Sequence, residues 1–139
     1  MKLSARNQFA GKVAKIQDGA VNGIVTIDVN GTPVSATISM AAIKELGLAP
    51  GKAAYAVIKA TEVMVGKGGH LPLSARNQFP GKVVAVEKGA VNSIVKIKAL
   101  GDNELSATIS NAAVEELGLA EGVDALAVIK ATSVMVGVE

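Results

Sequence analysis

The sequence has no cysteine, a single histidine and only three aromatic residues. Without cysteine, the chain can form neither a disulfide nor a thiolate metal site. The histidine, His70, lies in a glycine-rich stretch, where a solvated spacer residue is far more common than a catalytic base. Sites for single-stranded nucleic acid usually combine basic grooves with stacking aromatic rings. Three aromatic residues and a net charge of +2 therefore argue against a nucleic-acid partner.

Long apolar runs are also absent. No stretch approaches the roughly 18 apolar residues that would predict a transmembrane helix. Polar residues follow Lys2 at positions where a signal peptide would be apolar. We therefore expect no membrane partner and a cytoplasmic location. Known catalytic and phosphate-binding motifs are missing as well, and the carboxylates that recur, Glu45 and Glu116, fall on an exposed helix face. We expect no enzyme activity, no catalytic residue, no metal and no cofactor.

What the sequence does contain is a repeat. Ser-Ala-Arg-Asn-Gln-Phe occurs at residues 4–9 and again, letter for letter, at residues 74–79. Gly-Ala-Val-Asn likewise occurs twice, and most of the remaining positions also align. The repeat predicts a first domain at residues 1–66, a linker at 67–72 and a second domain at 73–139. Units this small are marginally stable alone, so we expect them to pack together and to oligomerise.

Each unit is predicted to consist of short strands and one short helix. Half of the residues are hydrophobic, and the abundance of Val and Ile favours sheet. In the first unit we expect a helix at 40–46, capped by Ser39 and ended by Gly47, and a hairpin turn at Asn30-Gly31. The expected strands are residues 3–7, 12–17, 24–29, 33–39, 53–59 and 63–65, with a break at Gly11. The predicted fold class is all-β, with two tandem OB-like small β-barrels, each with one short helix.

The repeated motif concentrates hydrogen-bond donors. Ser4, Arg6 and Asn7 place a hydroxyl, a guanidinium and an amide within four residues, and such a set usually faces an anion. Lys59 and Lys130 end apolar strands in the two units, and each is followed by a small Ala-Thr pair. Together these groups predict a pocket for a small tetrahedral oxyanion. The alternatives are a strand-end motif kept for packing and a lysine that extends from a barrel rim into water.

The Gly-Ala-Val-Asn turns offer a second oxyanion site. A glycine and small side chains leave backbone N–H groups accessible, and the asparagine adds an amide. A turn kept only for its geometry explains the repeat equally well. The residues concerned are Gly19, Ala20, Val21 and Asn22 in the first unit and Gly89, Ala90, Val91 and Asn92 in the second.

These motifs, followed by Val-Ile-Lys-Ala-Thr-x-Val-Met-Val-Gly in both halves, resemble the molbindin family, which is built from Mop domains, also called TOBE. Two units in one chain resemble the di-Mop members, which bind molybdate and tungstate and assemble as trimers with oxyanions at subunit interfaces. The resemblance implies that Ser39 and Ser110 contribute hydroxyls to a neighbouring unit. Ala42 and Ala113 stand where related molybdate-responsive regulators carry a further serine. The remaining implied oxyanion-binding residues are Ser4, Ala5, Arg6, Lys59 and Ala60, and Ser74, Ala75, Arg76, Lys130 and Ala131.

Together with the predicted anion pocket, the resemblance implies a homotrimeric protein that binds molybdate or tungstate for molybdenum storage and homeostasis. Selection against sulfate would rest on the size of the pocket, because charge and shape are the same. Two alternatives stay open. One is an oxyanion-sensing regulatory module that acts on a protein partner, and the other is an OB-type binder of single-stranded nucleic acid.

Overall fold

The computed structural model describes all residues, 1–139, and contains mainly strands. Along each half, three strands precede a short α-helix, and a fourth strand, a 3₁₀ turn and a three-residue strand follow it. The first half comprises β1 (Asn7–Gln17), β2 (Asn22–Val29), β3 (Thr32–Ser39), α1 (Met40–Glu45), β4 (Ala53–Ile58), η1 (Ala60–Glu62) and β5 (Met64–Gly66). The second comprises β6 (Asn77–Lys88), β7 (Asn92–Ala99), β8 (Asn103–Ser110), α2 (Asn111–Leu117), β9 (Asp124–Ile129), η2 (Ala131–Ser133) and β10 (Met135–Gly137).

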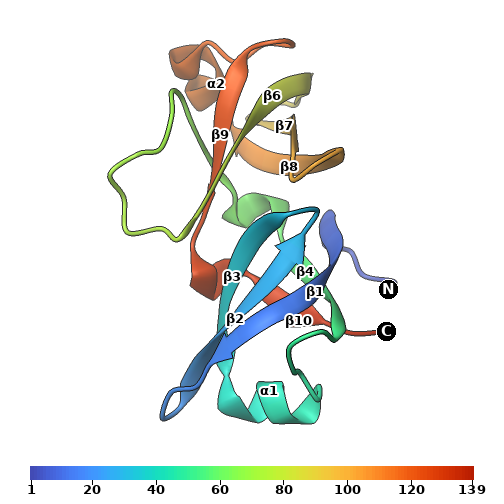
Figure 1. The fold of residues 1–139 in the computed structure, drawn as a ribbon. Coiled ribbons are helices and arrows are strands. Elements are labelled where there is room, and N and C mark those ends of the chain that lie inside the picture. Colours follow the sequence, from blue (N-terminus) through green and yellow to red (C-terminus); the bar gives the residue numbers. More distant parts are fainter.

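The strands form two five-stranded antiparallel sheets that exchange their last strands. One sheet has the order β10-β4-β1-β2-β3, and the other has the order β5-β9-β6-β7-β8. The short strand that ends each half therefore completes the sheet of the other half, and Figure 1 shows β10, in red, beside β4. The all-β class and the helix between the third and fourth strands are confirmed. No feature of the sequence predicted the exchange.

The start of the chain differs from the expectation. Residues 3–6 are not a strand, because β1 begins at Asn7 and runs through Gly11 to Gln17 without a break. Gly11 is needed for close approach, since a Cβ there would overlap the carbonyl oxygen of Asp28 on the neighbouring strand. The irregularity in pairing comes later, where the register shifts between Val13 and Lys15.

The predicted turn and caps of the first half are confirmed. The side chain of Ser39 accepts a hydrogen bond from the backbone N–H of Ala42 at 3.0 Å, which is the N-cap arrangement. Gly47 has a φ of +61°, and the backbone N–H of Leu48 donates to the carbonyl of Ile43 at 3.0 Å, which closes the helix in a Schellman motif. Local residue chemistry therefore fixes where these elements begin and end.

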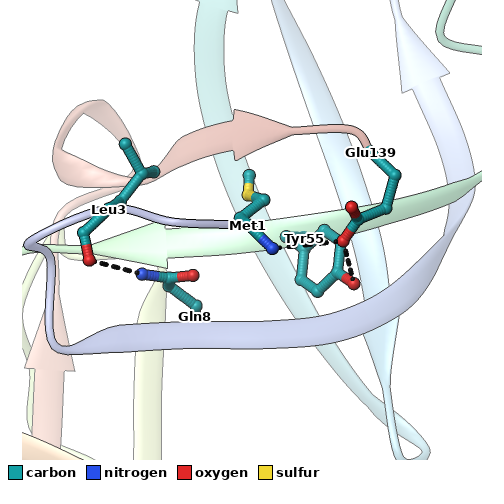
Figure 2. A network of polar contacts seen from close by, with 5 residues as sticks. All are labelled: Met1, Leu3, Gln8, Tyr55 and Glu139. Carbon is teal, nitrogen blue, oxygen red and sulfur yellow. Dashed lines mark hydrogen bonds and ion pairs between the residues drawn. The ribbon is translucent and has the colours of Figure 1, made fainter.

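One aliphatic core runs through both halves. A single cluster of 26 buried residues draws on the inner faces of both sheets, and its only aromatic members are Phe9 and Phe79. The α-helices have only 6 and 7 residues, too few for a membrane-spanning helix. Near the ends of the chain, the Met1 amino group and the Tyr55 hydroxyl both donate to the Glu139 carboxylate, at 3.2 and 2.6 Å, as Figure 2 shows.

Two asparagines join the halves. The Asn7 side chain donates to the carbonyl of Ser106 at 2.9 Å and accepts from its N–H at 2.8 Å. Asn77 makes the same pair of bonds to Ser35, at 2.9 and 2.8 Å. Both asparagine residues are buried, with 0% and 1% exposure. The expectation that this amide faces an anion is therefore wrong, because its donor and acceptor already pair with the backbone of the other half.

Candidate oxyanion site

The loop that carries the serine and arginine is held by the glutamine of the same motif. The Gln8 side-chain amide donates to the carbonyls of Leu3 and Ala5, at 3.2 and 2.9 Å, and Figure 2 shows the first of these bonds. Gln78 braces the second copy through Leu71 and Ala75. These bonds close the loop on itself just before the strand begins. The residues of the repeated motif thus divide their roles between facing solvent, joining the halves, bracing the loop and, for Phe9 and Phe79, filling the core.

The first pocket lies where this loop meets the end of β4. It has a volume of about 360 Å³ and carries two cations, Arg6 and Lys59, but no carboxylate. The 3₁₀ turn η1 begins directly after Lys59, so its small residues lie beside the lysine. The other half contributes two lining residues, one from β8 and one from β10. The lining residues are Leu3, Ser4, Ala5, Arg6, Lys59, Ala60, Thr61, Thr108 and Met135.

The second pocket repeats the first with the roles of the halves exchanged. Its volume is about 210 Å³, and Arg76 and Lys130 are its only charged residues. Thr37, from β3 of the first half, occupies the place that Thr108 has in the first pocket. The lining residues are Thr37, Ser74, Ala75, Arg76, Lys130, Ala131 and Thr132. The structure therefore brings together ten of the twelve residues that the sequence predicted for the main sites.

The sequence reasoning missed four threonines. Thr61 and Thr132 follow the lysine-alanine pair within the same half, whereas Thr37 and Thr108 come from the opposite half. Each adds a hydroxyl, which can donate to an anion. A signal was present, because all four lie in stretches that are identical in both copies.

Ser39 and Ser110 do not line either pocket. Each is the N-cap of a short helix, and each hydroxyl accepts a backbone N–H bond, from Ala42 or from Ala113, at 3.0 Å. Both residues are exposed in the single chain. Their contribution to a neighbouring copy remains a prediction.

The first Gly-Ala-Val-Asn turn borders a third hollow. Gly19 and Asn22 line this hollow of about 370 Å³ together with Asp18, and it shares Thr37 and Arg76 with the second pocket. The predicted main and additional sites therefore adjoin each other in the single chain. Ala20 and Val21 do not line the hollow, and Val21 is 73% exposed at the tip of the turn. Of the matching residues Gly89, Ala90, Val91 and Asn92, none lines a pocket, and Val91 is 72% exposed.

An ion pair lies near the first pocket. Lys96 on β7 contacts Glu87 on β6 at 2.9 Å, with 31% and 55% of the side chains exposed. The hydrogen bond from Lys96, then its charge, lowers the pKa of the Glu87 carboxyl, and the charge of Arg6 lowers it further. The same hydrogen bond and the charge of Glu87 raise the pKa of the Lys96 ammonium, and the charge of Arg6 partly opposes this. Arg6 therefore lies within the electrostatic range of both groups.

Replacing Glu87 by glutamine should lower the unfolding temperature slightly at neutral pH and not at low pH. The folded-state pKa of Glu87 lies below its ordinary 4.5, so its contribution is present above that value and is lost as the pH falls through the folded pKa. The effect is small because more than half of the side chain is exposed. Thermal melts of both proteins at neutral pH and below the folded pKa test this. A difference that persists at low pH would mean that Glu87 does not stabilise through its charge.

Comparison with known protein families divides the chain into the same two units as the sequence repeat. The model of the TOBE domain matches residues 3–65 and 73–136, which is nearly the whole chain. The chain belongs to the TOBE-domain family. The resemblance to two-domain molbindins is confirmed, because the chain has a TM-score of 0.95 and 42% identity to a crystal structure of the cytoplasmic molybdate-binding protein ModG with molybdate bound, over 100% of both chains.

Two relatives differ in how much of their own length the two TOBE units of this chain cover. The molybdenum transport protein ModE of Herbaspirillum seropedicae is 43% identical over 141 residues, covering 100% of this chain and 52% of that protein. A probable molybdenum-pterin-binding protein of Haemophilus influenzae is 63% identical over 67 residues, covering 48% of this chain and 97% of that protein. The chain thus spans about half the length of the first relative, and one of its units spans nearly all of the second.

Proposed function

We propose that this chain binds molybdate or tungstate without covalent chemistry, as a cytoplasmic storage and homeostasis protein and not as an enzyme. The observation that carries the proposal is the pair of equivalent pockets, each lined by an arginine, a lysine and a serine, and by no carboxylate. The similarity to a ModG structure with molybdate bound supports the choice of ligand. ModG is a cytoplasmic protein, and the similarity therefore supports the proposed cytoplasmic location.

The lining suits a tetrahedral dianion. Arginine and lysine supply charge, and charge-assisted hydrogen bonds are about twice as strong as neutral ones. Ser4, Thr61 and Thr108 supply hydroxyl donors from three different parts of the chain, the loop before β1, the turn η1 and β8. The lining contains no histidine or carboxylate that could activate its hydroxyl groups as nucleophiles, so nothing in it indicates a reaction with the anion. Binding and release are therefore the whole of the proposed chemistry.

We propose further that the anions lie at the interfaces of a homotrimer. Six large apolar side chains are exposed at matching positions of the two halves, and burial of exposed apolar side chains against another copy would favour association. Leu3 and Met135 are exposed apolar residues that also line the first pocket. A neighbouring copy on this surface would therefore close the pocket. The exposed pairs are Leu3 with Leu73, Val21 with Val91, and Met64 with Met135.

Isothermal titration with molybdate, followed by sulfate, tests the proposed function. We expect tight molybdate binding at several sites per oligomer and much weaker sulfate binding. Light scattering at micromolar concentration should report a trimer. Absence of heat with both molybdate and tungstate would overturn the proposed ligand, and a monomer would contradict the interfacial sites.

A second candidate is an oxyanion-sensing module that acts on a protein partner. The observation that favours it is the match to half of the longer ModE protein, since a binding unit can serve inside a larger chain. A pull-down with and without molybdate separates the two roles. A stoichiometric partner that is retained only with the anion would favour sensing, and no partner under either condition would favour storage.

A further inference from the structure

The outer edge of β8 borders the first pocket, the Arg6 pocket, through Thr108. In an antiparallel pair, only alternate residues exchange N–H and carbonyl bonds with the residue opposite. Ser106 lies opposite Lys96 of β7, but its N–H and its carbonyl both bond the Asn7 side chain. Ser106 therefore marks the positions of β8 whose backbone groups point outward. Thr108, two residues further along the strand, has the same orientation.

The outer edge of β3 in the first half shows the same alternation. The N–H and the carbonyl of Ser35 bond the Asn77 side chain, so Ser35 faces outward. Pro33 comes two residues earlier, where its missing N–H costs no ladder bond, and Thr37 comes two residues later and lines the second pocket. Among the backbone hydrogen bonds outside helices and strands, none uses the N–H of Thr37 or Thr108. Each pocket is thus lined by a residue of the opposite half whose N–H the fold leaves unpaired.

We propose that the backbone N–H of Thr108 is a direct ligand of the oxyanion beside Arg6, and that the N–H of Thr37 has the same role beside Arg76. The inference rests on the proposed function, because it concerns the same two sites. A donor that is part of a sheet is already ordered, so binding costs no side-chain entropy. The Thr108 carbonyl faces the same side and repels an anion, but Lys59 lines the same pocket and can donate to that carbonyl.

This geometry gives the buried asparagine of the repeated motif a positioning role. Asn7 directly follows Arg6, and the residue that it bonds, Ser106, lies two positions before Thr108. The two bonds therefore hold the loop that carries the guanidinium against the strand edge that carries the unpaired N–H. An anion between them contacts both halves of the chain.

The test uses proline, which removes a backbone N–H and adds no charge. At an outward position of an edge strand, this change leaves the ladder bonds in place. In an Arg76→Ala chain, which retains the Arg6 pocket, Thr108→Pro should bind molybdate about 10- to 100-fold more weakly than Thr108→Val. The valine variant removes the hydroxyl and keeps the N–H, so isothermal titration of the two isolates the backbone donor. Thr37→Pro and Thr37→Val in an Arg6→Ala chain repeat the test for the second pocket.

The matched control is Glu104→Pro. Its position corresponds to Pro33 of the first half, faces outward on the same strand as Thr108, and does not line the pocket. It should change the affinity less than about threefold, through the lost charge alone. Equal affinities of Thr108→Pro and Thr108→Val would overturn the inference, and so would an equally large loss in Glu104→Pro. Absence of molybdate binding in the wild type would instead overturn the proposed function.

A second measurement needs no proline variant. In nuclear magnetic resonance spectra of the isotope-labelled chain, the amide protons of Thr108 and Thr37 should shift when molybdate is added. Those of Ser106 and Ser35 should shift less, because they stay bonded to the asparagines. Threonine amides that stay in place while molybdate binds would overturn the inference and leave the proposed function intact.

Discussion

Replacing Arg6 and Arg76 together by alanine should abolish tight molybdate binding and leave the fold intact. Each guanidinium lines its pocket beside a lysine, and neither arginine forms an ion pair with a carboxylate. Loss of a charge-assisted, two-pronged contact to a dianion costs about 2–4 kcal/mol per site, or roughly 30- to 1,000-fold in affinity. Isothermal titration measures the loss, and thermal unfolding should change little because both side chains are exposed.

The matched control is Lys12→Ala with Lys82→Ala. These lysines are also repeated in the two halves, and their removal subtracts the same total charge. Neither lines an oxyanion pocket, and Lys82 instead contacts Asp124 at 2.8 Å. The control should weaken binding less than about threefold, through long-range charge alone. Equal losses in the two double variants would mean that net charge, and not the pocket, holds the anion.

Local features of this fold could be predicted because local chemistry determines them. Asn30-Gly31 forms the hairpin turn with φ values of 51° and 87°, as that dipeptide favours. Ser39 and Gly47 bound the helix because one accepts a backbone N–H and the other adopts a left-handed conformation. In each case the responsible contacts lie within a few residues, so the sequence contains the whole cause.

The exchange of strands could not be predicted in this way. Met64–Gly66 pairs with β9 of the second half, and an identical Met-Val-Gly pairs with β4 of the first. Because the two segments have the same residues, pairing within a half or between halves has the same local energetics. The choice depends on how the halves pack together, which a strand pattern does not encode.

The candidate site likewise contains residues that the sequence could predict and residues that it could not. Arg6, Lys59 and Ser4 could be found because the repeat singles out donors. Thr108 was missed because it lines the Arg6 pocket from the other half of the chain, where the two halves pack together. Asn7 was misassigned because the sequence alone does not distinguish an asparagine that binds an anion from one that pairs with the backbone. Only burial and the two bonds to Ser106 separate these roles.

Replacing Asn7 by alanine should destabilise the protein by about 2–4 kcal/mol, because the N–H and carbonyl of Ser106 lose their partners in a buried place. Asn77→Ala should have a similar effect through Ser35. The double variant should lose a large fraction of the 5–15 kcal/mol that is typical of folded domains. Urea unfolding at one fixed protein concentration measures each change, because an oligomer's stability depends on concentration.

Two further variants separate the bonds from the side-chain volume. Asn7→Asp keeps the shape and can accept from the Ser106 N–H, but it cannot donate to the carbonyl and it buries a charge, so it should be at least as destabilised as alanine. Asn22→Ala removes an exposed asparagine and should change stability by less than about 0.5 kcal/mol. If Asn7→Asp were as stable as the wild type, the bond to the Ser106 carbonyl would contribute nothing to joining the halves. If Asn7→Ala were as mild as Asn22→Ala, the exchanged strands and the aliphatic core would be sufficient to hold the two halves together.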